Sequence, residues 1–177
     1  MFGQSFLSNP ILREAMFFGV ISGAVGTAFT LASILIRFDR WVWLRLFDLN
    51  GISMFSCCLI ASVVVVRQTG RTSAAVIASV IAGVIGCLIY TGAQWAAPYA
   101  LFDHLVHYPF LHEDFSNSGI PTIKAYLVSE KGYWGVVGTT VGMLQYALPF
   151  CVLLASVLGL IGSSLGSWSR LNPVSEQ

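Results

Sequence analysis

The chain has 177 residues, of which 56% are hydrophobic and only 10% are charged, and its formal net charge is +1. Soluble domains carry charge on about a quarter of their residues, so this composition, with a mean hydropathy of +0.77, excludes an ordinary soluble domain. A nearly neutral chain without a basic run or an RNA-binding aromatic motif also excludes nucleic acid as a partner. The lipid bilayer is the expected environment.

The position of the charges divides the chain. All 17 formal charges fall outside four intervals, residues 15–36, 49–66, 72–102 and 132–169. A bilayer core of about 30 Å requires about 20 helical residues, and a lone charge inside it costs a few kcal/mol. We therefore predict an all-α fold, an integral membrane four-helix bundle. It forms a single domain over residues 1–177, with spans at about 15–36, 49–66, 72–98 and 138–163 and a long extramembrane loop at 99–137.

The first helix is predicted to begin at Pro10, because Ser8 and Asn9 offer capping side chains immediately before a proline. The segment 1–10 has no basic region, and the apolar run after it is too long for the core of a signal peptide and lacks an A-x-A cleavage pattern. We expect this run to be retained as the first span.

The connection 37–48 interleaves three arginines with tryptophan and phenylalanine, which suits a segment at the headgroup level. Asn50-Gly51 then opens the second span, and residues 67–71 form a tight turn into the third. Within the long loop, residues 116–121 carry turn signals. Residues 122–131 could form a short amphipathic helix with Ile123, Tyr126 and Leu127 on one face.

Small residues recur at spacings of three and four along the first, third and fourth spans, and this pattern predicts helix-packing faces. In lipid, helices associate through close backbone approach, because hiding leucine from equally apolar tails gains little. A hinge or a ligand crevice is the alternative. The predicted packing residues are Gly19, Gly23, Gly26, Gly83, Gly86, Gln94, Gly138, Gly142, Gln145, Ser156 and Gly159.

Two polar residues on these stripes, Gln94 and Gln145, lie near the same membrane face. Antiparallel spans could bring their amides into contact, either to fix helix register or to bind a ligand. The four cysteines, Cys57, Cys58, Cys87 and Cys151, all lie in predicted spans without a C-x-x-C pattern. We expect them to be small apolar packing residues.

All three histidines fall in residues 103–114, together with three carboxylates. If a helix continues through His107, then His104 and His107 share a face, and a bend at Pro109 could return His112 and Glu113 to complete a zinc-like or iron-like set. The alternative is an interfacial rim of solvated polar side chains. His104 is also the candidate axial ligand of haem or chlorophyll, since such a group needs one imidazole and an apolar slot.

The order of features resembles a bacterial family of four-span membrane proteins of unknown function, catalogued as domain of unknown function 4199. The resemblance rests on the glycine-rich first span 18–26, on residues 71–75 and 83–86 with Tyr90, and on an aromatic loop before a glycine-rich last span. It implies the bacterial inner membrane and four helices, and it brings no catalytic residues.

An even number of spans puts both termini on one side of the membrane. Counts of four basic residues on that side and five opposite do not settle the orientation. We favour cytoplasmic termini, because Arg67 and Arg71 lie in the shortest connection while Lys124 and Lys131 share theirs with acidic residues.

Three classes of function stay open, and the sequence identifies no cofactor. We favour a non-enzymatic accessory subunit, with the bilayer and other membrane subunits as partners, because the spans hold no intramembrane charge and the small-residue stripes outnumber what four helices need internally. The second class is a small transporter or a metal-dependent membrane enzyme, which needs a polar cavity converging on Gln94, Gln145 and His104. The third is a pigment- or haem-binding subunit.

Overall fold

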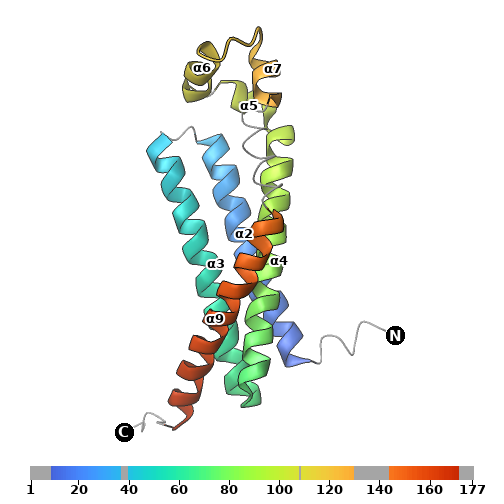
Figure 1. Cartoon of the computed structure of the whole chain (residues 1–177), viewed down its shortest axis with the longest axis vertical. Helices are drawn as coiled ribbons and strands as arrows, with labels where there is room; N and C mark the ends of the chain where they lie inside the picture. Colours follow the sequence, from blue (N-terminus) through green and yellow to red (C-terminus); the bar gives the residue numbers. More distant parts are fainter. Residues whose placement is uncertain (1–8, 37–39, 108, 130–143, 172–177) are drawn as a thin grey trace, which may run out of the picture.

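The computed structural model describes residues 9–36, 40–107, 109–129 and 144–171, and every regular element within these ranges is an α-helix (Figure 1). Four long helices form a bundle: α2 (Pro10–Leu35), α3 (Arg40–Thr69), α4 (Thr72–Ala100) and α9 (Leu144–Leu171). Three short helices lie between α4 and α9 in the chain: α5 (Phe102–Val106), α6 (Pro109–Ser116) and α7 (Ile123–Val128). The predicted all-α four-helix bundle is confirmed.

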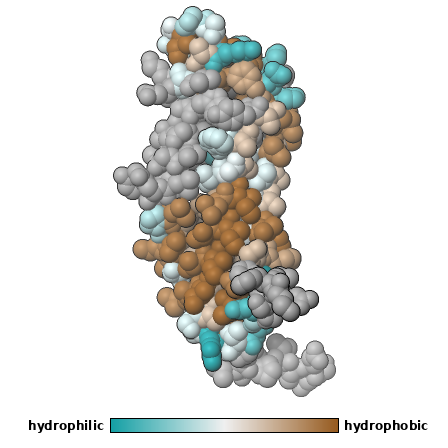
Figure 2. All heavy atoms as spheres, turned by 90° about the vertical axis from the view of Figure 1, so that its right-hand side faces the viewer, coloured by the Kyte–Doolittle hydropathy of each residue, from teal (hydrophilic) through white to brown (hydrophobic). Residues whose placement is uncertain are grey.

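Each long helix contains a stretch that is long and apolar enough to cross a membrane. These stretches are Pro10–Ala32, Gly51–Thr69, Thr72–Ala96 and Leu148–Trp168. Figure 2 shows a hydrophobic band around the middle of one face of the molecule, with hydrophilic residues towards both ends. This distribution matches a bilayer core between two aqueous interfaces.

The start of α2 follows its predicted local signal. The side chain of Asn9 accepts a hydrogen bond from the backbone N–H of Ile11 at 3.0 Å, and Pro10 occupies the first turn. This cap satisfies one of the N–H groups that a helix leaves without a partner at its beginning.

The connection before the second span is helical over most of its length, and the apolar stretch itself begins at Gly51. Residues 40–48 are the first turns of α3, which continues without a break to Thr69. The helix then ends at Gly70, whose φ of 71° is left-handed and whose N–H donates to the carbonyl of Val66 at 2.8 Å. A glycine adopts this conformation without steric cost, so α3 and α4 are joined by only two residues.

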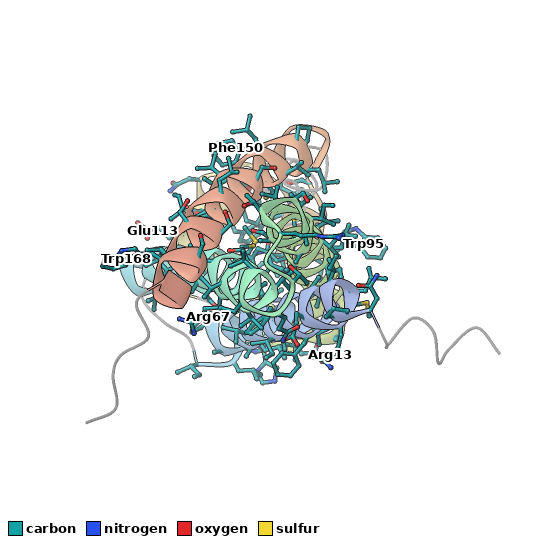
Figure 3. All side chains as sticks on the ribbon, turned by 90° about the horizontal axis from the view of Figure 1, so that it is seen from below. Arg13, Arg67, Trp95, Glu113, Phe150 and Trp168 are labelled. Carbon is teal, nitrogen blue, oxygen red and sulfur yellow. The ribbon has the colours of Figure 1, made fainter. Side chains whose placement is uncertain are left out.

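Helices α3 and α4 form the centre of the bundle, because each of them packs against the other three long helices (Figure 3). Within the described residues, α2 and α9 make little contact, so they lie on opposite sides of the α3–α4 pair. The start of α2, the α3–α4 turn and the end of α9 share one end of the bundle, called here the turn end. Helices α5–α7 lie at the opposite end, called the cap end.

The cap end has a small core of its own. Leu105, Tyr126 and Leu127 are buried together, and the rings of Phe115 and Tyr126 lie 5.9 Å apart. Helix α7 begins at a capping residue, since the Thr122 hydroxyl accepts from the N–H of Ala125 at 3.2 Å. The short amphipathic helix predicted in this region is therefore confirmed over residues 123–128, with Tyr126 and Leu127 on its inner face.

Candidate functional site

Glycines bring α2 and α4 into close contact. A Cβ built on Gly19 would lie 2.9 Å from the Cβ of Ile85 and 3.0 Å from the carbonyl oxygen of Ala82. A Cβ on Gly86 would lie 2.8 Å from the hydroxyl oxygen of Ser22. Since real Cβ atoms essentially never approach a neighbour within 3.0 Å, the observed separation of these helices requires glycine.

Helix α9 uses the same device on both of its neighbours. A Cβ on Gly159 would lie 2.8 Å from the Cα of Val76 in α4. On the α3 side, a Cβ on Gly162 would collide with the Ser62 hydroxyl and approach the Leu59 carbonyl oxygen to 2.9 Å. The α9 helix is thus seated between α3 and α4 by backbone-to-backbone contact.

The remaining predicted packing positions are distributed as follows. Gly83 faces both α9 and α3, with an added Cβ 3.2 Å from that of Ala155 and 3.3 Å from the sulfur of Cys58. Gly26 is buried, and its carbonyl accepts from the Thr30 hydroxyl at 3.0 Å. Gly138 and Gly142 lie outside the described residues.

The inner face of α9 coincides only in part with the predicted stripe. Its buried positions are Ala155, Gly159, Gly162, Ser163 and Gly166, whereas the hydroxyl of Ser156 bonds within its own helix to the Val152 carbonyl at 2.7 Å. Ala155 and Gly162 were not among the predicted packing residues. A spacing of three and four residues fits the face that contains Ser156 as well as the face that contains Ala155 and Gly162. The run of alanine and glycine on the second face was the signal that could have distinguished them.

Buried hydroxyl groups are satisfied by helix carbonyls. Ser79 in α4 donates across the interface to the carbonyl of Ala155 in α9 at 2.7 Å, and Ser62 donates within α3 to Leu59 at 2.7 Å. In the described part of the chain, no buried side-chain nitrogen or oxygen lacks a hydrogen-bond partner. Such bonds keep polar groups from being stranded in an apolar environment.

Gln94 is buried near the cap end of α4, and its amide nitrogen donates to the Tyr90 hydroxyl one turn earlier. This donor is therefore used on its own helix. The predicted contact with Gln145 stays a prediction, because the Gln145 side chain lies outside the described residues.

The histidine segment is spread along the cap end. His104, His112 and Glu113 are exposed, and the Nδ1 of His107 lies 2.6 Å from the backbone oxygen of Asp103. Within the described ranges, no three His, Cys, Asp or Glu side chains are grouped so that they could hold a metal ion. The structure thus does not bring together the predicted set of three histidines and Glu113, because the break between α5 and α6 leaves His104, His112 and Glu113 exposed and does not group them.

His104, the candidate axial ligand for haem or chlorophyll, lies on the five-residue helix α5 with its side chain exposed. The apolar side chains of that helix turn instead towards the Leu105–Tyr126–Leu127 core.

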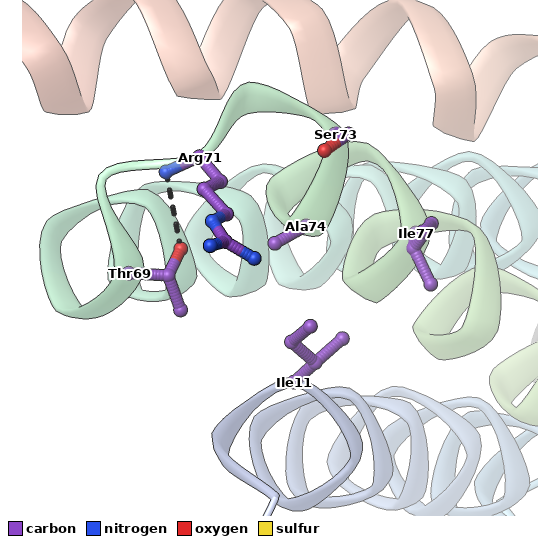
Figure 4. A pocket seen from close by; sticks show the side chains of 6 residues that line it. All are labelled: Ile11, Thr69, Arg71, Ser73, Ala74 and Ile77. Carbon is purple, nitrogen blue, oxygen red and sulfur yellow. Dashed lines mark hydrogen bonds between the residues drawn. The ribbon is translucent and has the colours of Figure 1, made fainter.

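A groove lies at the turn end, between α2 and the beginning of α4 (Figure 4). It has a volume of about 460 Å³, inside the range of about 300–1,000 Å³ for small-molecule sites. Apolar, hydroxyl and cationic side chains meet there, although their positions in the sequence are far apart. The lining residues are Ile11, Thr69, Arg71, Ser73, Ala74 and Ile77.

The four apolar helices, their glycine contacts and the exposed apolar band define a multi-pass membrane protein of the helical bundle class. No protein-family model, no curated protein and no solved structure matches this chain.

Proposed function

We propose that this protein is a non-enzymatic accessory subunit of a larger membrane complex, and that it packs against its partner through the outer face of α9. The supporting observation is the asymmetry of this helix. Its apolar span is the least enclosed of the four, with 22% of it buried against 44% for α4. Eight large apolar side chains are exposed along it: Phe150, Val152, Leu153, Val157, Leu160, Ile161, Leu165 and Trp168.

This outer face differs in kind from the inner one. Small residues hold α9 to α3 and α4, whereas the outer face presents large side chains with an aromatic residue near each end. Phe150 is 63% exposed and Trp168 is 68% exposed, and both point away from the bundle (Figure 3). Aromatic anchors of this type contribute much of the energy of protein interfaces.

The described glycines of the small-residue stripes pack inside the bundle and leave no visible surplus for a partner. The glycine stripes were expected to exceed the internal needs of the bundle, but Gly19, Gly83, Gly86 and Gly159 all face neighbouring helices. The proposal therefore depends on the large side chains of α9 and not on the small-residue stripes.

The α9 face is tested by paired truncation. We expect Leu153→Ala with Leu160→Ala to reduce co-purification of the native complex in mild detergent by about tenfold or more, because truncated interface anchors cost about 2 kcal/mol or more. Quantitative mass spectrometry of the affinity-purified complex measures the change. The matched control is Val20→Ala with Ile21→Ala on the outer face of α2, which should leave recovery unchanged. Equal recovery from both double variants, or a lone protein in the wild-type sample, contradicts the proposal.

We infer that the turn end faces the cytoplasm of a bacterial cell, in the inner membrane. Among the described side chains, the turn end carries Arg13, Arg67 and Arg71, while the cap end has Lys124 among acidic residues. Short basic connections favour the cytoplasmic side. The resemblance to the domain of unknown function 4199 family supports the bacterial assignment and is itself part of this proposal.

This orientation has a direct test. A C-terminal fusion to a fluorescent protein that folds only in the cytoplasm should be bright, and a C-terminal alkaline phosphatase fusion should be inactive. The control is phosphatase inserted at Gly119, an exposed position in the cap end, which should be active. The reverse pattern of activities places the termini outside.

A further inference from the structure

The groove at the turn end has apolar walls that continue the surface of the spans. Ile11 is half-buried in the first turn of α2, and Ile77 is 51% exposed on α4. Both belong to the apolar stretches of their helices, Pro10–Ala32 and Thr72–Ala96. Ala74 between them is part of a buried cluster with Ala15, Val65 and Ala78. The groove thus has a packed floor and an opening at the level where the spans meet water.

The charged side chains around this groove differ in their ion pairs. Arg13 pairs with Glu14 at 2.7 Å, and the same Glu14 oxygen accepts from the Gln68 amide at 3.3 Å. Glu14 is therefore already engaged, and no carboxylate among the described residues pairs with Arg71. The backbone N–H of Arg71 donates to the Thr69 hydroxyl at 3.3 Å, which fixes the turn while the guanidinium reaches over the groove (Figure 4).

We propose that this groove binds an anionic phospholipid. The guanidinium of Arg71 takes the phosphate, with the exposed Ser73 hydroxyl as a second donor, and the glycerol and first acyl segment lie along Ile11 and Ile77. A guanidinium presents its donors as a planar fork that suits phosphate oxygens. The apolar walls distinguish a lipid from a water-soluble phosphate, which would leave them in contact with water.

The charged groups around the groove also determine which lipid headgroup fits. A zwitterionic lipid carries its own cation near the phosphate, and this cation would lie beside Arg71 with the nearby carboxylate of Glu14 already engaged. Like charges at short range are unfavourable, so a lipid without a headgroup cation is preferred. Anionic lipids also enrich the cytoplasmic surface, which is where the turn end is proposed to lie.

The proposal is tested on the full chain in mild detergent by native mass spectrometry during titration with phosphatidylglycerol or phosphatidylcholine. We expect phosphatidylglycerol to bind more tightly, and Arg71→Ala to weaken that binding about tenfold, as for the loss of one charge-assisted hydrogen bond. The matched control is Arg67→Ala. Arg67 carries the same charge and lies about one turn from Arg71, but it does not line the groove. This substitution should change the affinity less than about twofold, since surface charge pairs at that distance are weak.

Two further arms keep the result unambiguous. Arg71→Lys retains the charge and should recover part of the affinity, which an unfolded variant could not do. Glycerol phosphate, which lacks acyl chains, should not displace the lipid. Equal losses for Arg67→Ala and Arg71→Ala, equal binding of the two lipids, or displacement by glycerol phosphate would each overturn the assignment.

Discussion

Gly162→Ala is expected to loosen α9 from α3 and to lower the stability of the bundle by about 1–3 kcal/mol, the usual cost of overpacking a tight contact. The added methyl group would meet the Leu59 carbonyl oxygen at 2.9 Å and the Ser62 side chain. Ser62 could rotate, but Leu59 presents backbone, so the helices must separate. For a chain of 177 residues, this loss corresponds to a fall of roughly 2–12 °C in the apparent Tm in detergent.

A thiol-reactive dye measures this change, because Cys57, Cys58 and Cys87 are buried in the folded bundle and react when it opens. The matched control is Gly92→Ala in α4, where an added Cβ has no neighbour within 4 Å. That substitution lowers the conformational entropy that the unfolded chain loses when the helix forms, so it should be neutral or slightly stabilising. A Tm for Gly162→Ala that equals the control value would mean that α9 does not approach α3 as described.

Gly23→Ala is expected to have an effect of similar size on the opposite side of α4, and here the chain offers a reciprocal substitution. The added Cβ would lie 2.5 Å from the Cβ and 2.7 Å from the Cγ2 of Ile89. A branched side chain has few rotamers in a helix, so Ile89 cannot turn away. The single substitution should therefore cost about 1–3 kcal/mol.

Exchanging the sizes should remove this cost. Ile89→Gly alone destabilises the bundle through lost packing, but in that background Gly23→Ala should cost nothing further, since the space above it is now open. The four proteins form a double-mutant cycle, whose coupling energy is read from their detergent stabilities. If Gly23→Ala costs the same with and without Ile89, the two residues are not in contact and the α2–α4 register is different.

The sequence allowed correct prediction of features that depend on local chemistry. The Asn9–Pro10 start of α2 follows from hydrogen bonding over three residues, and the short helix at 123–128 follows from one cap and one apolar face. Prediction was weaker where no capping residue or proline marked the start of a helix. The second span was expected from about Leu49 and its apolar stretch begins at Gly51, but helix α3 extends back to Arg40, because charged and aromatic residues are good enough helix formers to extend a span into the interface.

The candidate sites were less predictable, since both depend on how helices are placed relative to one another. Three imidazoles within nine residues predicted a metal site in the histidine segment. The structure places His104 on α5 and His112 on α6, and both side chains are exposed. The groove has no sequence signature, because Ile11 and Arg71 are far apart in the chain and each is unremarkable alone. Only the packing of α2 against α4 makes them neighbours.

By itself, the sequence determined that the chain forms four apolar helices able to span a membrane. Intervals of sufficient length without charge leave few alternatives when every backbone polar group must be satisfied in lipid. The tertiary structure alone decided that α3 and α4 form the central pair, that α9 turns Ala155 and Gly162 inward, and that Arg71 lies over a groove beside Ile11. In a bilayer the inner and outer faces of a helix are equally apolar, so hydropathy carries no information on its rotation. Steric fit between backbones selects that rotation instead.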